Sequence, residues 1–158
     1  MAGEQMVLRA IDHVGIAVPD LDAALTWYRE TLGMTVEYVE TNTEQGVTEA
    51  MVRVSDDDTG ARLQILAPSS PDSPIARFLD RSGPGMQQLA YRVDDVEHAA
   101  NVLRERGLRL LYDEPRRGTA ESMINFVHPS DAGGVLIELV EPAGEQPSVS
   151  PTEPRRIP

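Results

Sequence analysis

The chain contains 158 residues, of which 26 are acidic, 14 are basic and none is cysteine, and its net charge is −12. This length suits one domain with a single core. The missing cysteine excludes disulfides, thiolate metal ligands and cysteine nucleophiles, and the negative charge argues against nucleic acid or an anionic membrane as partner.

The basic residues are all arginine, which excludes Schiff-base chemistry on a lysine. Apolar runs in the sequence are far shorter than the roughly 20 residues that cross a bilayer. The first residues also lack the basic-then-apolar pattern of a signal peptide. We therefore expect a cytoplasmic protein that binds no membrane.

Patterns in the first half predict a strand, a helix and three further strands. Residues Ala10 to Val18 alternate between apolar and small or polar side chains, as in a strand. Asp20 caps the predicted helix that follows, and Gly33 ends it. The remaining strands are expected at 34–40, 46–54 and 61–67, and a short helix at 74–80.

The same order of elements begins again after a Gly-Pro-Gly break. A strand at 86–93 leads to a helix that Asp94 or Asp95 caps and Gly107 ends. Three more strands are expected at 108–112, 122–127 and 134–140. The tail at 143–158 is rich in Pro, Ser and Glu, and we expect it to be disordered.

The two halves can be overlaid on each other with a shift of 75 residues at the start and 74 at the end. Matched pairs include His13 with Gln88, Asp20 with Asp95, Gly33 with Gly107, and Gln64 with Glu138. The predicted fold is therefore α+β, with two tandem β-α-β-β-β modules at 9–68 and 86–142. They form a single domain over 9–142.

Strand alternation places a metal-capable side chain beside a small one on one face of the first strand in each module. If a pseudo-twofold axis relates the modules, four such residues converge on it: His13, Gln64, Gln88 and Glu138. One imidazole, two amide oxygens and one carboxylate suit cobalt, manganese, nickel, magnesium or zinc. A histidine or glutamine in a strand also has ordinary structural roles, but an unpaired buried Glu138 would be unfavourable.

Glu49 is a second acidic residue of interest, because it interrupts the apolar strand pattern QGVTEAMVRV. It is either a functional carboxylate or an edge-strand charge that faces the solvent.

At these residues the chain resembles the methylmalonyl-CoA epimerases of the vicinal oxygen chelate superfamily, from about Arg9 to Pro142. The segments that carry the resemblance are IDHVGIAVPDLDAALTWYRETLG, EQGVTEAM, LQILAP, DSPIARFL, LLYDEPRRGT, INFVHP and GGVLIELVE. The resemblance implies an open, cupped sheet around a divalent metal ion bound by the four residues above. Gln88 departs from a histidine of the family pattern GxHHxA, and Ser130 departs from a lysine.

The resemblance also implies an acyl-CoA substrate, whose α-proton is removed to give an enolate stabilised by the metal ion. It nominates Glu49 and Glu138 as the two acid–base residues. Arg116 and Arg117 either bind the anionic end of the substrate or form a solvated turn. A homodimer is expected by analogy with the superfamily.

Two alternatives to the epimerase remain open on the sequence alone. The first is a glyoxalase-like lyase or isomerase, in which a glutamine ligand is tolerated. The second is a metal-free small-molecule-binding accessory protein of specialised metabolism, consistent with the exchanges at Gln88 and Ser130. An extradiol dioxygenase is disfavoured, because its two-histidine, one-carboxylate iron site would lack a histidine here.

Overall fold

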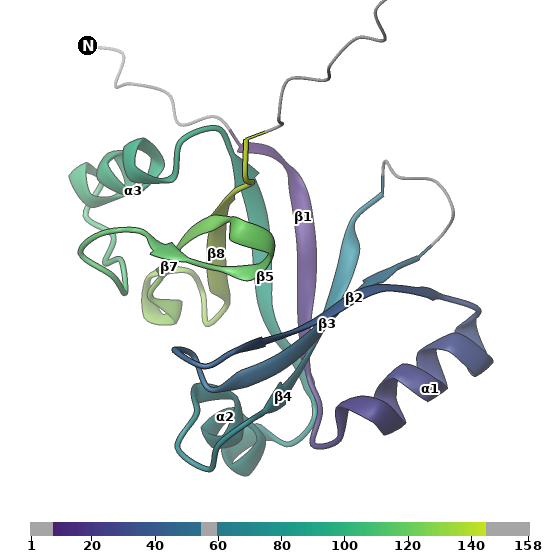
Figure 1. Cartoon of the computed structure of the whole chain (residues 1–158). Coiled ribbons are helices and arrows are strands. Elements are labelled where there is room, and N and C mark those ends of the chain that lie inside the picture. The colour runs from purple at the N-terminus through teal and green to yellow at the C-terminus, as the bar shows by residue number, and fades with distance from the viewer. Residues whose placement is uncertain (1–7, 55–59, 145–158) are drawn as a thin grey trace, which may run out of the picture.

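The structure is a computed structural model that describes residues 8–54 and 60–144. Eight strands form one sheet, with three α-helices and two short 3-10 helices around it (Figure 1). The elements are β1 (Leu8–Ala17), α1 (Leu21–Leu32), β2 (Thr35–Asn42), β3 (Val47–Arg53), β4 (Arg62–Pro68), α2 (Pro74–Ser82), β5 (Gly85–Val93), α3 (Val96–Glu105), β6 (Arg116–Arg117), η1 (Thr119–Glu121), β7 (Met123–Val127), η2 (Pro129–Asp131) and β8 (Leu136–Glu141).

The strand order β2-β3-β4-β1-β5-β8-β7-β6 shows the internal repeat directly. We call β1 to β4 with α1 module one, and β5 to β8 with α3 module two. Within each module the first strand pairs in parallel with the last, β1 with β4 and β5 with β8, and the two first strands pair antiparallel with each other. The predicted α+β architecture of two β-α-β-β-β modules is confirmed.

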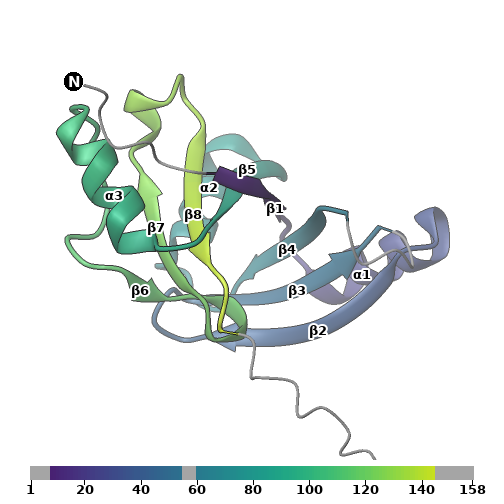
Figure 2. The same ribbon diagram turned by 90° about the horizontal axis from the view of Figure 1, so that it is seen from above.

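The sheet curls rather than lying flat. In Figure 2 the strands of module two stand across those of module one, and β6 approaches β2 over the space between them. Continuous pairing through β1 and β5 with a strong twist produces this cupped shape. The cup places side chains from both modules around a common centre.

Helices α1 and α3 cover the outer faces of their modules. Asp20 accepts a hydrogen bond from the Ala23 backbone N–H at 3.0 Å, and Asp95 accepts one from His98 at 2.9 Å, so both predicted caps are present. Helix α1 packs Leu25 against the apolar residues of β3 and β4, and α3 packs its apolar stripe against β7 and β8. Burying these stripes fixes which face of each strand turns inward.

Helix α2 lies between the modules in sequence and has no counterpart in the repeat. Its Ile75 is buried with Ala17, Val47 and Leu66, which belong to β1, β3 and β4. The helix therefore covers the opposite face of module one from α1 and closes one end of the cup (Figure 1).

The strand predicted at 108–112 is wrong, because this segment makes only one isolated bridge, Leu110 with Val127. The backbone N–H of Leu111 does donate to the Phe126 carbonyl. At the next residue, Tyr112, a side chain takes the place of the neighbouring strand's backbone. Asn125 accepts from the Tyr112 N–H at 3.2 Å and donates to the Tyr112 carbonyl at 3.0 Å. This buried amide satisfies the backbone groups that a ladder would have used, and the outer strand of module two is instead β6.

Most of the tail expected to be disordered, from residue 145 on, lies outside the described residues, as does the turn at 55–59. Among the helices of the described part, none is long and apolar enough to span a membrane.

Candidate active site

The structure brings the four predicted metal ligands together from four strands. His13 lies on β1, Gln64 on β4, Gln88 on β5 and Glu138 on β8. His13, Gln64 and Glu138 are all at most 4% exposed. Buried polar groups of this kind must be satisfied by one another or by a ligand.

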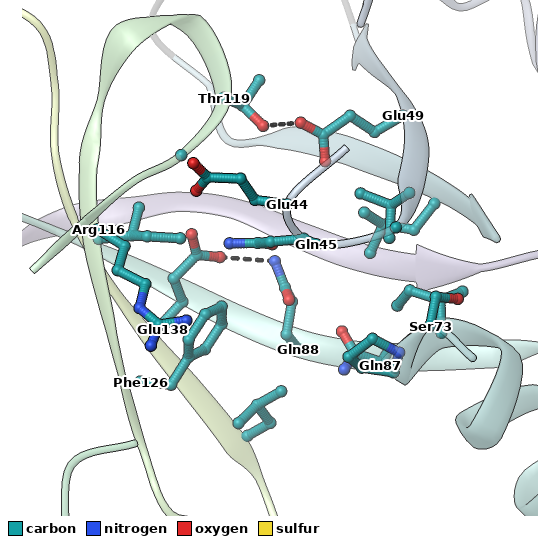
Figure 3. Close-up of a pocket in the computed structure, with 18 of the residues that line it drawn as sticks. Glu44, Gln45, Glu49, Ser73, Gln87, Gln88, Arg116, Thr119, Phe126 and Glu138 are labelled. Atoms are coloured by element: carbon teal, nitrogen blue, oxygen red, sulfur yellow. Dashed lines mark hydrogen bonds between the residues drawn. The ribbon is translucent and has the colours of Figure 1, made fainter. Parts of the chain in front are cut away.

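Polar atoms of these residues converge on the side-chain amide nitrogen of Gln88. Gln88 Nε2 lies 2.6 Å from Glu138 Oε2, 2.9 Å from Gln64 Oε1 and 3.3 Å from His13 Nε2. Figure 3 draws the contact between Gln88 and Glu138 as a dashed line. A carboxylate oxygen, an amide oxygen and a ring nitrogen from three other strands therefore surround one amide group.

The sheet register explains this convergence. Across β1 and β5, His13 pairs with Ala90 and Gly15 pairs with Gln88, so each metal-capable residue faces a small one. Gly15 is required here for space, because a Cβ on it would lie 2.4 Å from Gln88 Cγ. Glycine at this position lets the Gln88 side chain cross over β1 toward Gln64 on β4.

Glu49 on β3 joins the same network through Gln64. Gln64 Nε2 donates to Glu49 Oε2 at 2.8 Å, and the Thr119 hydroxyl donates to Glu49 Oε1. Glu49 is only 3% exposed. Burial raises its pKa to about 7; the hydrogen bond from Thr119 opposes this and the nearby Glu138 charge adds to it. A carboxyl group tuned in this way can take or give a proton near neutral pH.

His13 is held by a carboxylate on each side of its ring. Nδ1 lies 2.7 Å from Asp12 Oδ2, and Nε2 lies 3.1 Å from Glu138 Oε2. Burial alone would lower the pKa of His13, but the hydrogen bonds and charges of Asp12 and Glu138 outweigh it and raise the pKa to about 9. Because a histidine binds a metal ion through an unprotonated ring nitrogen, binding of a cation would displace one proton from this ring.

Two cavities reach the network from different sides. The larger, of about 470 Å³, is lined by Glu49, Gln64, Gln88 and Glu138 together with residues of α2 and of the β2–β3 turn. The smaller, of about 260 Å³, has His13 in its wall. Thr119 and Glu138 line both cavities, and the network therefore separates one from the other.

The two predicted substrate-binding arginines lie in different places. Arg116 lines the larger cavity, and its guanidinium stacks 4.0 Å above the Tyr112 ring centroid. Arg117 is exposed and pairs with Glu121 at 3.0 Å. Because adjacent residues of β6 point to opposite sides, Arg116 faces the cavity and Arg117 is not among the residues that line it.

The donor set fits a divalent cation. Its neutral His13 nitrogen, two amide oxygens and one carboxylate form a mixed nitrogen–oxygen set, and a half-turn of the Gln88 carboxamide presents Oε1 instead of Nε2. Within the described ranges, no group of three or more His, Cys, Asp and Glu could hold a metal ion. The site therefore depends on its two glutamines.

Comparison with known proteins places this site in a family. Residues 12–127 match the Glyoxalase/Bleomycin resistance protein/Dioxygenase superfamily. The ethylmalonyl-CoA/methylmalonyl-CoA epimerase of Cereibacter sphaeroides is 37% identical over 131 residues, which span 82% of this chain and 95% of that protein. The crystal structure of methylmalonyl-CoA epimerase from Mycobacterium tuberculosis is 52% identical, with a TM-score of 0.84 over 89% of this chain and 93% of that one.

The chain belongs to the methylmalonyl-CoA epimerase family. It is accordingly an isomerase of the epimerase class. Another solved member of the family, a methylmalonyl-CoA epimerase in complex with methylmalonyl-CoA and NH4+, is 46% identical, with a TM-score of 0.83 over 87% of this chain and 97% of that one. The resemblance seen in the sequence is confirmed, and so is the vicinal oxygen chelate fold.

Sequence reasoning missed three residues that contact this site. Thr119, in the segment LLYDEPRRGT, reaches from module two to Gln64 at 3.0 Å and to Glu49. Arg92 donates to Asp12, and Asp12 contacts His13. Simple strand alternation argues against the second contact, because the neighbours Asp12 and His13 would point to opposite faces. The sequence does show the Thr119 hydroxyl close to the two candidate arginines. The contact of Asp12, in contrast, could be predicted only from the register between β1 and β5.

Proposed function

We propose that the protein interconverts the (2R) and (2S) forms of methylmalonyl-CoA or a related 2-alkylmalonyl-CoA. The observation that carries this proposal is the convergence of His13, Gln64, Gln88 and Glu138, with Glu49 adjoining through Gln64. The epimerases of Cereibacter sphaeroides and Mycobacterium tuberculosis, at 37% and 52% identity, favour this activity over a glyoxalase-like lyase or a binding protein.

His13, Gln64, Gln88 and Glu138 are the residues that would hold a divalent cation. When bound, such a cation polarises the thioester and stabilises negative charge on its oxygen. Cobalt, manganese, nickel, magnesium and zinc all accept this donor set. Three of these four side chains, those of His13, Gln64 and Glu138, are buried.

Glu49 and Glu138 are the proposed proton carriers. Inversion at a carbon requires a base on one face and an acid on the other, and these carboxylates come from different modules. Thr119 holds Glu49 by one oxygen and Gln64 holds it by the other, which fixes the direction of its lone pairs. A carboxyl with a pKa near 7 exchanges its proton readily at neutral pH.

We assign Arg116, which lines the larger cavity as Arg77 also does, to bind an anionic part of the substrate. Arg116 is exposed at the cavity wall, whereas the network around Gln88 carries buried carboxylates. Arg116 therefore supplies positive charge to the cavity of an otherwise acidic protein. Arg117 is exposed and pairs with Glu121, so we assign it no contact with the substrate. We further propose a cytoplasmic homodimer built from single domains that span 9–142.

The first experiment follows α-deuterium incorporation in D2O. The metal-loaded protein is incubated separately with (2R)- and (2S)-methylmalonyl-CoA, and exchange is read by mass spectrometry. We expect incorporation from both isomers in the wild-type protein and, in Glu49→Ala, loss of incorporation from the isomer whose α-proton Glu49 removes. Arg117→Ala is the matched control, because its side chain lies outside both cavities.

Exchange that survives Glu49→Ala unchanged would refute the assigned role of Glu49. Absence of exchange in the wild-type protein with every divalent metal tested would refute the methylmalonyl-CoA assignment. Ethylmalonyl-CoA would then be the next substrate to assay.

A further inference from the structure

Asp12 lies between the candidate metal ligand His13 and an arginine of the other module. Its Oδ2 is 2.7 Å from His13 Nδ1, and its Oδ1 accepts from Arg92 Nε at 3.0 Å and from Arg92 Nη2 at 2.8 Å. The Asp12 side chain is 15% exposed and that of Arg92 is 45% exposed. Each carboxylate oxygen therefore serves one partner.

A β-bulge creates this contact. The pairing of β1 with β5 shifts between Ile11 and His13, because Ile11 pairs with Tyr91 and His13 with Ala90, which leaves Asp12 as the extra residue. Bulges re-aim side chains that would otherwise alternate. Here the bulge brings the Asp12 carboxylate to the ring of its own neighbour.

We propose that Asp12 and Arg92 are positioning residues that hold His13 with Nε2 directed at the other three ligands. The inference rests on the proposed function in one respect, the use of a divalent cation. Asp12 accepts the Nδ1–H, and this leaves Nε2 as the ligand atom. Arg92 fixes Asp12 in turn, by its fork of two N–H groups on a single oxygen.

The general chemistry of histidine ligands supports this arrangement. A metal-bound histidine usually donates its second ring N–H to a carboxylate or carbonyl, and loss of that partner typically weakens metal binding 10- to 100-fold. Asp12 can accept this N–H because its Oδ2 lies 2.7 Å from His13 Nδ1, while its other oxygen accepts the two N–H groups of Arg92.

The contact of a carboxylate with the candidate metal ligand belongs to module one. Under the shift of 75 residues, Asp12 corresponds to Gln87 and His13 to Gln88. The side-chain oxygen of Gln87 is buried, and the described residues give it no hydrogen-bond partner. The two halves of the site are thus built differently, and His13 is the ligand with a charged support.

The test measures Co²⁺ binding by the full-length protein and its variants Asp12→Asn and Arg92→Gln. A carboxamide has only one acceptor oxygen, so Asp12→Asn can serve His13 or Arg92 but not both. Dissociation constants come from competition with a chelating indicator. The second readout is water exchange of the His13 Nδ1 proton, whose NMR line the paramagnetic ion shifts away from other signals.

We expect Asp12→Asn to weaken Co²⁺ binding about 10- to 100-fold and to accelerate exchange of this proton, and Arg92→Gln to act in the same direction by less. The matched control is Arg9→Gln. Arg9 also joins β1 to module two, through Asp94, but this pair is exposed, whereas His13 is buried. This variant should bind Co²⁺ like the wild type.

Wild-type affinity and wild-type proton exchange in Asp12→Asn would overturn the inference. Melting temperatures of all variants separate loss of folding from loss of positioning, because a merely structural role would not change proton exchange in the folded, Co²⁺-loaded protein. Tight Co²⁺ binding that needs Asp12, without deuterium incorporation into methylmalonyl-CoA, would uphold the inference and refute only the proposed function.

Discussion

Gly15 offers a direct test of how the two modules meet at the site. In Gly15→Ala, the new Cβ would lie 2.4 Å from Gln88 Cγ, 3.0 Å from Gln88 Cδ and 3.2 Å from Leu66 Cδ1. Ordinary carbon–carbon contact needs about 3.5 Å or more. The Gln88 side chain must therefore move by roughly 1 Å near its base, and its amide end must leave the network.

Two magnitudes follow from this displacement. A reacting or ligating group moved by about 1 Å loses roughly 100-fold in rate. Overpacking costs about 1–3 kcal/mol of folding free energy, which corresponds to a fall of roughly 2–12 °C in melting temperature for a chain of this size. We expect both effects in Gly15→Ala, measured by deuterium incorporation and by thermal denaturation.

Gly60→Ala is the matched control, because a Cβ at Gly60 meets no heavy atom of the described residues within 4 Å. It should leave both measurements unchanged. Wild-type exchange and wild-type melting temperature in Gly15→Ala would show that Gln88 does not cross over β1 as described, and would remove the packing argument for its role.

Three further predictions concern charge and ligand type. Glu49→Gln should reduce deuterium incorporation about 10²- to 10⁴-fold for the isomer that Glu49 deprotonates. For that isomer the wild-type rate should rise with pH through the pKa of Glu49, which burial raises to about 7; a flat profile would argue against Glu49 as the base. Gln88→His adds a nitrogen ligand and should raise affinity for Co²⁺ relative to Mg²⁺ in competition titrations, whereas an unchanged ratio would indicate that Gln88 is not a ligand. Arg109 forms an ion pair with Asp131 at 3.0 Å and lowers the pKa of Asp131 to about 2. Asp131→Asn should therefore be less stable than wild type above about pH 4, and the difference should vanish below about pH 2; a difference that persists below about pH 2 would contradict a role of this ion pair in stability.

The repeat made most of the fold predictable from the sequence. Matched capping residues, Asp20 with Asp95, and the alternation of the first strand of each module fixed the order of elements before any register was known. The segment at 108–112 could not be predicted in the same way, because Asn125 replaces its ladder with side-chain hydrogen bonds. A single buried amide, invisible to periodicity, decides that local structure. The domain limits at 9–142 stay a prediction.

The site was predictable to the extent that it follows from symmetry. Alternation and the two shifts were enough to nominate His13 with Gln88 and Gln64 with Glu138, since these positions are related by the repeat. Contacts between residues that the repeat does not relate could not be predicted from the sequence. Thr119 comes from a loop in module two and bonds to module one, and Asp12 depends on a bulge.

Gln88 corresponds to His13 in the repeat and also connects the other candidate metal ligands. Its amide contacts Gln64, His13 and Glu138 at once, so one side chain joins three strands in addition to its own. A histidine ring nitrogen carries at most one N–H there and could not make all three contacts. The glutamine therefore couples the geometry of the ligands to one another, and variants at Gln64 or Glu138 should disturb Gln88 as well. For that reason, substitutions within this network should be non-additive, whereas Arg9→Gln combined with any of them should be additive.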